Sequence, residues 1–383
     1  MSVTTPQGFL AAGVAAGLKS TGKPDLALIV NTGPARAAAA VFTSNRALAN
    51  PILWSREVIR DGRVDAIVLN SGGANCFTGS QGFQTTHATA EAVAAAVGAS
   101  ATDILVCSTG LIGEQLDRDK LTAGVTAAAA ALSETGGEDA AAAIMTTDTV
   151  PKTSEFLAPE WSIGGIAKGA GMLAPGLATM LVVITTDAVL DSAALDAALR
   201  EATRVSFDRL DSDGCMSTND QVTLLASGAS GITPDLADFT GALTGVCRDL
   251  AEQLQGDAEG ASHDIAIAVS GAATEEDAVE VGRSVARNNL FKAAIYGNDP
   301  NWGRVLAAIG TTSAPFDPYN VDVVFNGVRV CHEGAPDASR DLVDLTPRAV
   351  NIEIHLNNGS ASATILTNDL THDYVHENSA YAS

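Results

Sequence analysis

The sequence is poor in basic residues, in aromatic residues and in long apolar runs, and each shortage excludes a class of protein. Lys and Arg number 22 against 45 Asp and Glu, which gives a formal net charge of -23. Nucleic acids and anionic membranes are bound by basic faces, so neither is expected as a partner. Aromatic residues make up only 4% of the chain, and the core must be built mostly from small and aliphatic side chains. No stretch approaches the roughly 20 apolar residues that a membrane-spanning helix needs.

Cysteine is also scarce and follows no pattern. The chain has five cysteines, an odd number without any Cys-x-x-Cys pair, at Cys76, Cys107, Cys215, Cys247 and Cys331. Neither a disulfide scaffold nor a zinc ribbon is therefore indicated. The N-terminus lacks the basic segment and apolar run of a signal peptide. Together with the lack of a membrane-spanning run, this predicts a soluble, cytoplasmic protein.

What the sequence does contain is a large apolar fraction arranged as short strands and Ala-rich helices. Hydrophobic residues make up 46% of the 383 residues and charged residues 17%, enough for a large core and about two domains. Short β-type runs predict strands, and Ala-rich stretches predict helices. The predicted strands are 25–30, 38–43, 65–70, 104–108, 180–185 and 264–270, and the predicted helices are 86–97, 120–132, 192–205 and 275–289.

The last part of the chain has a different pattern. Residues 321–330 and 351–367 alternate between apolar and polar side chains, which is typical of antiparallel strands. Asn-Gly pairs at 326–327 and 358–359 predict tight hairpin turns within these stretches. The predicted fold class is therefore mixed α/β or α+β.

Two motifs that suggest ligand sites lack the context that such sites need. Residues 169–174 match the glycine pattern of dinucleotide-binding loops, but Pro175 and Gly176 follow at once, so no helix can begin there to hold a pyrophosphate. His372 and His376 lie four residues apart, but neither a helix nor a third ligand is indicated, so we expect a solvated tail and no metal. The Gly-x-Ser-x-Gly elbow of hydrolases and the phosphate-binding Walker loop do not occur.

The segment 168–186 has two possible interpretations. A small residue, Ala178, precedes Thr179, and an apolar strand begins immediately after it. Cleavage between them would leave Thr179 as a free N-terminus, whose hydroxyl attacks an acyl carbon while its own α-amine accepts the proton. Spacing alone favours the second interpretation, in which Thr179 is an ordinary residue that opens a strand.

The order of several motifs carries a resemblance to a known family. GFLAAGVAAGLK at 8–19, VFTSNR at 41–46, LNSGGANCFTG at 69–79, STGLIG at 108–113 and MTTDTVPK at 145–152 come first. KGAGMLAP at 168–175, LATMLVVITTDA at 177–188, STND at 217–220, GDAEGAS at 256–262, GNDPNWGR at 297–304 and the final YVHENSAYAS follow. In these motifs the chain resembles the ornithine acetyltransferase, or bifunctional glutamate N-acetyltransferase, family of arginine biosynthesis.

The resemblance implies a fold and a set of site residues. The fold is the layered α/β form of self-cleaving enzymes with an N-terminal nucleophile, here a fragment 1–178 and a fragment 179–383 joined as two copies of each. Thr179 matches the family's nucleophile at the Ala178–Thr179 cleavage site, and Thr109 and Gly110 match its oxyanion hole, which stabilises the negative oxygen formed on attack. The matching substrate-contacting positions are Thr146, Lys168, Thr179, Glu259, Asn378 and Ser383.

The implied reaction is a double displacement without a metal or organic cofactor. Thr179 takes the acetyl group from N2-acetylornithine, and glutamate then accepts it; some family members also use acetyl-coenzyme A. An aminopeptidase or amidase with the same nucleophile remains an alternative, and so does an uncut, non-catalytic binding protein. If a histidine rather than the α-amine were the base, His263 near Glu259 would be the first candidate.

The chain departs from the family pattern at three places, none of them at Thr179. The stretch 73–77 contains Cys76 and Phe77 where the family usually has a second asparagine and a non-aromatic residue. Cys215-Met216 replaces a frequent Asp-Thr, and Ser383 a frequent threonine. These differences bear on packing around the site and on the choice of acyl donor.

Overall fold

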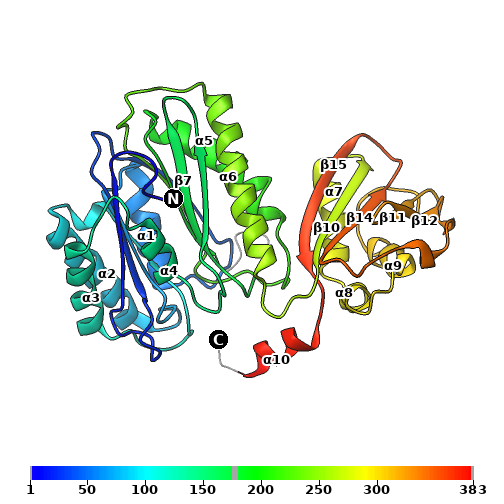
Figure 1. Cartoon of the computed structure of the whole chain (residues 1–383), viewed down its shortest axis with the longest axis horizontal. Helices are drawn as coiled ribbons and strands as arrows, with labels where there is room; N and C mark the ends of the chain where they lie inside the picture. Colours follow the sequence, from blue (N-terminus) through cyan, green and yellow to red (C-terminus); the bar gives the residue numbers. More distant parts are fainter. Residues whose placement is uncertain (1, 175–179, 381–383) are drawn as a thin grey trace.

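The computed structural model describes residues 2–174 and 180–380, which form a large lobe and a smaller one (Figure 1). The large lobe holds a four-stranded and a five-stranded sheet, and the small lobe holds a six-stranded sheet. The chain passes from the large lobe to the small one after α6 and returns after β15, so two segments join the lobes (Figure 1). This arrangement confirms the mixed α/β class.

The large lobe is a four-layer sandwich of two sheets between helices. Its first sheet has the order β1-β2-β4-β5, and its second has the order β3-β9-β8-β7-β6. The strands are β1 Phe9–Val14, β2 Leu26–Asn31, β3 Ala37–Phe42, β4 Ala66–Asn70, β5 Ile104–Ser108, β6 Lys152–Leu157, β7 Ser162–Lys168, β8 Leu181–Thr186 and β9 Gln221–Ala226. The helices are α1 Asn50–Val58, α2 Gly79–Val97, α3 Arg118–Ala130, α4 Gly137–Ala143, α5 Ser192–Arg204 and α6 Leu236–Gly256.

The central strands are apolar on both faces because both faces are covered. In β8, Leu181 and Val183 pack between the two sheets, together with side chains of α4. Val182 and Ile184 point to the opposite face and pack against α5 and α6. Side chains alternate between the faces of a strand, so a strand covered on both sides must be apolar throughout. This explains the uninterrupted run that begins at Met180.

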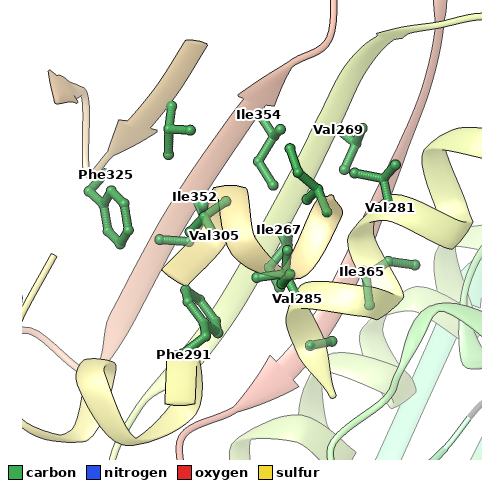
Figure 2. Close-up of a cluster of buried hydrophobic side chains, with 14 of the residues drawn as sticks. Ile267, Val269, Val281, Val285, Phe291, Val305, Phe325, Ile352, Ile354 and Ile365 are labelled. Carbon is green, nitrogen blue, oxygen red and sulfur yellow. The ribbon is translucent and has the colours of Figure 1, made fainter. Parts of the chain in front are cut away.

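The small lobe packs one sheet against helices around a core of Ile, Val and Phe (Figure 2). Its sheet order is β13-β12-β11-β14-β10-β15. The strands are β10 Asp264–Ala272, β11 Asp322–Phe325, β12 Val328–His332, β13 Ala335–Pro336, β14 Ala349–His355 and β15 Ala361–Asn368, and the helices are α7 Glu275–Ala286, α8 Asn289–Tyr296 and α9 Trp302–Ile309. In β14, Val350, Ile352 and Ile354 are buried while Asn351 and Glu353 between them are not.

The structure confirms one of the two predicted Asn-Gly turns and contradicts the other. Asn326 and Gly327 have φ of 44° and 83° and join the antiparallel strands β11 and β12. The strands on either side of Asn358-Gly359, β14 and β15, are not paired, because β10 lies between them and bonds to both. A long-range strand has therefore inserted where the local pattern indicated a hairpin, and the connection is a wide loop.

Helix boundaries differ from the prediction in three places. α2 begins at Gly79, seven residues before the predicted start, and the helix predicted for 275–289 ends at Ala286 before α8 starts. Residues 372–380, predicted to be a solvated tail, form helix α10, His372–Ala380, which lies beneath the gap between the lobes (Figure 1). Within the ranges that the structure describes, no helix is long and apolar enough to cross a membrane.

Candidate active site

Six of the residues singled out in the sequence line one pocket of about 530 Å³. They come from five separate parts of the chain: the end of β5, the loop before β6, the end of β7, the loop before β10, and α10. The six are Thr109, Gly110, Thr146, Lys168, Glu259 and Asn378. The other three predicted residues, Ala178, Thr179 and Ser383, lie outside the described residues. Hollows of about 770, 760 and 640 Å³ elsewhere on the molecule include none of the six.

The predicted oxyanion pair, Thr109 and Gly110, lies where the segments that follow β4 and β5 are hydrogen-bonded to each other. Thr109, directly after β5, donates its N–H to the Asn70 carbonyl and accepts the Gly73 N–H, each at 2.9 Å. Gly110 has φ of 124°, and a Cβ there would lie 2.8 Å from the Gly73 nitrogen. Only glycine fits both the backbone conformation and the space. These backbone contacts therefore hold Thr109 and Gly110 in place at the pocket wall.

Lys168 brings a buried positive charge to this pair. It is the last residue of β7, its side chain is 1% exposed, and its Nζ donates to the Thr109 hydroxyl at 3.3 Å. Burial lowers the pKa of Lys168, and the negative charges of Asp148 and Glu259 oppose that lowering. A cation held beside a hydroxyl is suited to stabilise negative charge that develops on a bound acyl group.

Asp148 ties the pocket segments together, although the sequence analysis did not single it out. One carboxylate oxygen accepts the Lys152 ammonium at 2.7 Å and the Gly169 N–H at 2.6 Å, and the other accepts the Thr146 N–H at 2.9 Å. Burial alone would raise the pKa of Asp148, but the charges of Lys168 and Lys152 outweigh it and lower that pKa to about 2. The sequence did contain a signal for this role: Asp148 and Lys152 are an acidic and a basic residue four positions apart in the motif 145–152.

Glu259 explains one glycine, Gly171, of the segment that resembled a dinucleotide-binding loop. Its backbone N–H donates to the Ala170 carbonyl at 2.9 Å. A Cβ on Gly171 would lie 2.7 Å from the Glu259 carboxylate, so any larger residue would displace it. No helix begins within 169–174, as predicted. Gly171 therefore allows a carboxylate, rather than a pyrophosphate, to approach the backbone.

The histidines do not form a pocket group. His263 is buried, with Nδ1 2.8 Å from Asp369 Oδ2 and Nε2 3.0 Å from the Leu345 carbonyl, and it does not line the pocket. His372 and His376 are exposed on α10, whereas the sequence analysis had expected no helix there. In the described part of the chain no group of three His, Cys, Asp or Glu side chains is arranged to hold a metal.

Two charged pocket residues were missed by the sequence analysis. Lys19 lines the pocket and donates from Nζ to the Met145 carbonyl at 2.7 Å and the Pro24 carbonyl at 3.1 Å. Glu114 lines it as well. Lys19 closes the motif 8–19, and Glu114 follows the motif 108–113, but neither position alone indicates a site. With Lys168 and Glu259 they give the pocket two positive and two negative side chains, which suits a zwitterionic ligand.

Four of the five residues at which the chain departs from the family pattern lie away from the pocket lining, and the fifth, Ser383, lies outside the described residues. Cys76 is buried in the loop after β4, whereas Phe77 has φ of 56° and a side chain that is 72% exposed. Cys215 is exposed, and Met216 lies beside the larger hollow near α7. None of these four residues lines the 530 Å³ pocket.

Comparison with known proteins identifies the family. The model of the ArgJ family matches residues 10–383. The arginine biosynthesis bifunctional protein ArgJ of Streptomyces coelicolor is 63% identical, and that of Streptomyces avermitilis 64%, each over the full length of both chains. The solved ornithine acetyltransferase of Mycobacterium tuberculosis, a complex with ornithine, is 52% identical, with a TM-score of 0.45, and the match covers 47% of this chain and 96% of that one. The chain belongs to the ArgJ family, the bifunctional acyltransferases of arginine biosynthesis.

Proposed function

We propose that Thr179, released as an N-terminus by cleavage of the Ala178–Thr179 bond, carries the acetyl group from N2-acetylornithine to glutamate. The observation that supports this most is the convergence of Thr109, Gly110, Lys168 and Glu259 on one pocket. Lys168, at the end of β7, pairs with Leu181 in β8, two residues after Thr179 in the chain. Because Lys168 also donates to the Thr109 hydroxyl, one residue connects the start of β8 with the predicted oxyanion pair.

The cleavage follows from the chemistry of a hydroxyl beside a peptide bond. The Thr179 Oγ attacks the Ala178 carbonyl carbon, the C–N bond breaks, and the nitrogen takes the hydroxyl proton. Water then adds its OH to the Ala178 carbon and returns its hydrogen to Thr179 Oγ. The products are fragments 1–178 and 179–383, the second with a free α-amine.

The transfer uses that α-amine as the base. The amine takes the Thr179 hydroxyl proton as Oγ attacks the acetyl carbon, while the Thr109 hydroxyl and the Gly110 N–H stabilise the oxyanion. Ornithine leaves with the proton, and the neutral α-amine of glutamate then attacks the acetyl ester. The bond between the acetyl carbon and Thr179 Oγ breaks, and the proton lost by the glutamate nitrogen passes through the Thr179 α-amine to Oγ. Lys168 and Glu259 contact the carboxylate and ammonium of the substrates, with Thr146, Asn378 and Ser383 completing the site.

The assembly and the second activity are part of the same proposal. The two fragments of each chain remain together, and two such pairs form a heterotetramer in the cytoplasm. Acetyl-coenzyme A serves as the acetyl donor for the second activity that the relatives' name, bifunctional, implies. The described residues of the pocket do not distinguish this donor from acetylornithine, so the assay must include both donors.

Intact-mass measurement with an acetyl-transfer assay tests the proposal. The purified protein should contain two fragments, and sequencing of the second should begin at Thr179. Thr179→Ala should remain one chain and transfer nothing, whereas Thr179→Ser keeps a hydroxyl and should still cut. A different new N-terminus, or loss of the acetyl group to water in the presence of glutamate, would overturn it. The second result would indicate an amidase.

A further inference from the structure

Lys19 is a half-buried cation of the pocket to which the mechanism above gives no role. It lies in the loop between β1 and β2, and it lines the pocket together with Lys168. No other Lys, Arg or His is among the described residues that line the pocket, and the segments outside the described ranges contain none in their sequence. Lys19 and Lys168 are therefore the two positive side chains of this chain that a bound substrate can meet there.

The fold holds Lys19 in place at both ends of its side chain. Asp25 is completely buried, and its two carboxylate oxygens accept three backbone N–H groups of the segment 16–19, at 2.6, 2.6 and 2.8 Å. At the far end, Lys19 Nζ donates to the Met145 carbonyl at 2.7 Å and to the Pro24 carbonyl at 3.1 Å. An ammonium has three hydrogens, and the described residues supply no acceptor for the third.

The charge of Lys19 is not neutralised by a carboxylate in contact with it. Within the described ranges Lys19 forms no ion pair, and both oxygens of Asp25 are occupied by backbone N–H groups. Burial lowers the pKa of Lys19, and so does the charge of Lys168, while Asp25 and Asp148 act in the opposite direction. A partly buried ammonium of this kind is stabilised by an anionic ligand, because the ligand replaces lost hydration and offsets the repulsion from Lys168.

The two amino acids that exchange the acetyl group differ in the charge at the end of the side chain. The terminal nitrogen of ornithine and the terminal oxygens of glutamate are the same number of bonds from the α-carbon, so both charged ends reach the same depth. In the proposed function the α-nitrogen reacts beside Thr109 and Gly110, and Lys168, which donates to Thr109, lies closest to the α-carboxylate. The second carboxylate of glutamate therefore needs a second cation.

We propose that Lys19 selects glutamate as the acetyl acceptor by binding its side-chain carboxylate through the third hydrogen of the ammonium. The assignment rests on the proposed function, and it adds how one pocket serves two amino acids of opposite side-chain charge. The same cation repels the side-chain ammonium of ornithine and so favours its departure after its acetyl group has been transferred. Glu114 and Glu259, which also line the pocket, keep that repulsion from excluding acetylornithine.

The first test compares two acceptors of opposite charge in Lys19→Met. One assay follows transfer from acetylornithine to glutamate, and the other follows exchange of the acetyl group between acetylornithine and isotope-labelled ornithine, which needs no glutamate. Loss of a hydrogen bond between charged groups should raise the Michaelis constant for glutamate by roughly 10- to 100-fold. The exchange with ornithine should stay at its parental rate or rise. Lys19→Arg keeps the charge and should keep most of the affinity for glutamate.

The second test changes the acceptor instead of the enzyme. Glutamine has the shape of glutamate without its side-chain charge, so the parent enzyme should prefer glutamate, and Lys19→Met should reduce that preference by the same factor. Lys23→Met is the matched control. Lys23 is exposed in the same loop and its charge also acts on Lys19, but it does not line the pocket. Its removal should leave the Michaelis constant for glutamate near the parental value.

The outcomes separate a specificity role from a structural one. If Lys19 only holds the Met145 and Pro24 carbonyls, a folded Lys19→Met variant should be impaired equally in both assays, and that result would overturn the proposal. A parent enzyme that accepts glutamine as readily as glutamate would also overturn it, and this measurement needs no variant. Should Lys19→Met fail to fold, Lys19→Gln, which keeps a neutral donor, takes its place.

Failure of the proposed function gives a different result. A parent enzyme that is active in both assays leaves the proposed function standing, whatever Lys19→Met does. A parent enzyme that transfers acetyl in neither assay would overturn the proposed function together with the role of Lys19.

Discussion

The two lobes differ most in what they bury. The interior of the large lobe contains several charged side chains, among them Asp25, Asp148, Lys152, Lys168, Asp187 and Asp220. The small-lobe core shown in Figure 2 is aliphatic and aromatic, and the charged groups buried in that lobe, Lys292 and Asp369, lie where it meets the large lobe. Lys292 donates to the Ser212 carbonyl, and Asp369 pairs with His263. Buried charge thus marks where chemistry is expected, and an apolar core marks a supporting unit.

The small lobe supports the pocket through the two segments that join the lobes. The segment before β10 carries Glu259, and the segment after β15 leads into α10, which carries Asn378. A sheet with a well-packed core holds the far ends of both segments, because β10 and β15 are paired along their length. The small lobe therefore positions two pocket residues without supplying any from its own core.

The largest effect should follow from breaking the buried charges of the large lobe with Lys152→Met. Lys152 is fully buried between Asp148 at 2.7 Å and Asp257 at 2.6 Å, so the change leaves two carboxylates without their cation. Loss of one partner from a buried ion pair costs about 3–5 kcal/mol of unfolding free energy. Urea unfolding measures this. Arg200→Met is the control, because the exposed Asp196–Arg200 pair has the same four-residue spacing and contributes only about 0.3–0.5 kcal/mol.

The same variant should change the response of the protein to acid. The folded pKa of Asp148, about 2, lies below the unfolded value of about 3.9, so its contribution to stability is present above the unfolded value and is lost as pH falls toward 2. Lys152→Met should weaken that contribution and shrink the difference between neutral and acid stability. An unchanged acid response would mean that Lys168 and the backbone donors alone hold the Asp148 pKa down.

The next effect concerns chemistry rather than stability. Thr109→Ala removes a hydroxyl that the oxyanion assignment uses mainly in the transition state, so turnover should fall by roughly 100- to 1,000-fold with little change in the Michaelis constant. Thr146→Ala is the matched comparison, since Thr146 is assigned to substrate contact and should mainly raise the Michaelis constant. A rise in the Michaelis constant alone for Thr109→Ala would make Thr109 a substrate anchor.

The lobes also differ in how well local pattern predicts them. The doubly buried strands β4 and β5 were predicted within one residue, because an apolar run of that length between turn residues has few alternatives. The Asn358-Gly359 turn was wrong because β10, about ninety residues earlier in the chain, inserts between β14 and β15. Local sequence carries no information on such an insertion.

The site was predictable mainly through the resemblance. Thr109, Lys168 and Glu259 are unremarkable residues in isolation, and only the motif order brought them together before the structure did. Lys19 and Asp148 lie within motifs that were noticed, but their roles depend on contacts with distant segments: Lys19 with the Met145 carbonyl and Asp148 with the Gly169 N–H. Contacts of this kind come from tertiary packing and cannot be inferred from spacing.

The smallest effect is expected at the junction of the lobes. His263 lies there and is the alternative to the Thr179 α-amine as the base of the transfer reaction. Both of its ring nitrogens are occupied, Nδ1 by Asp369 and Nε2 by the Leu345 carbonyl, and Asp369 also accepts the backbone N–H groups of Ser262 and His263. A histidine so engaged anchors the loop that carries Glu259 and has no free nitrogen to accept a hydroxyl proton.

His263→Ala should therefore keep the acid limb of the pH profile while it raises the Michaelis constant through Glu259. The α-amine, with an ordinary pKa of about 7.7–8.0, must be neutral to act, so activity should rise through one ionisation and then level off. Replacing each of the other five histidines in turn should likewise leave that limb in place. Disappearance of the limb in His263→Ala, with self-cleavage intact, would refute the amine as base. It would also make the junction of the lobes, rather than the large lobe, the place where the proton is held.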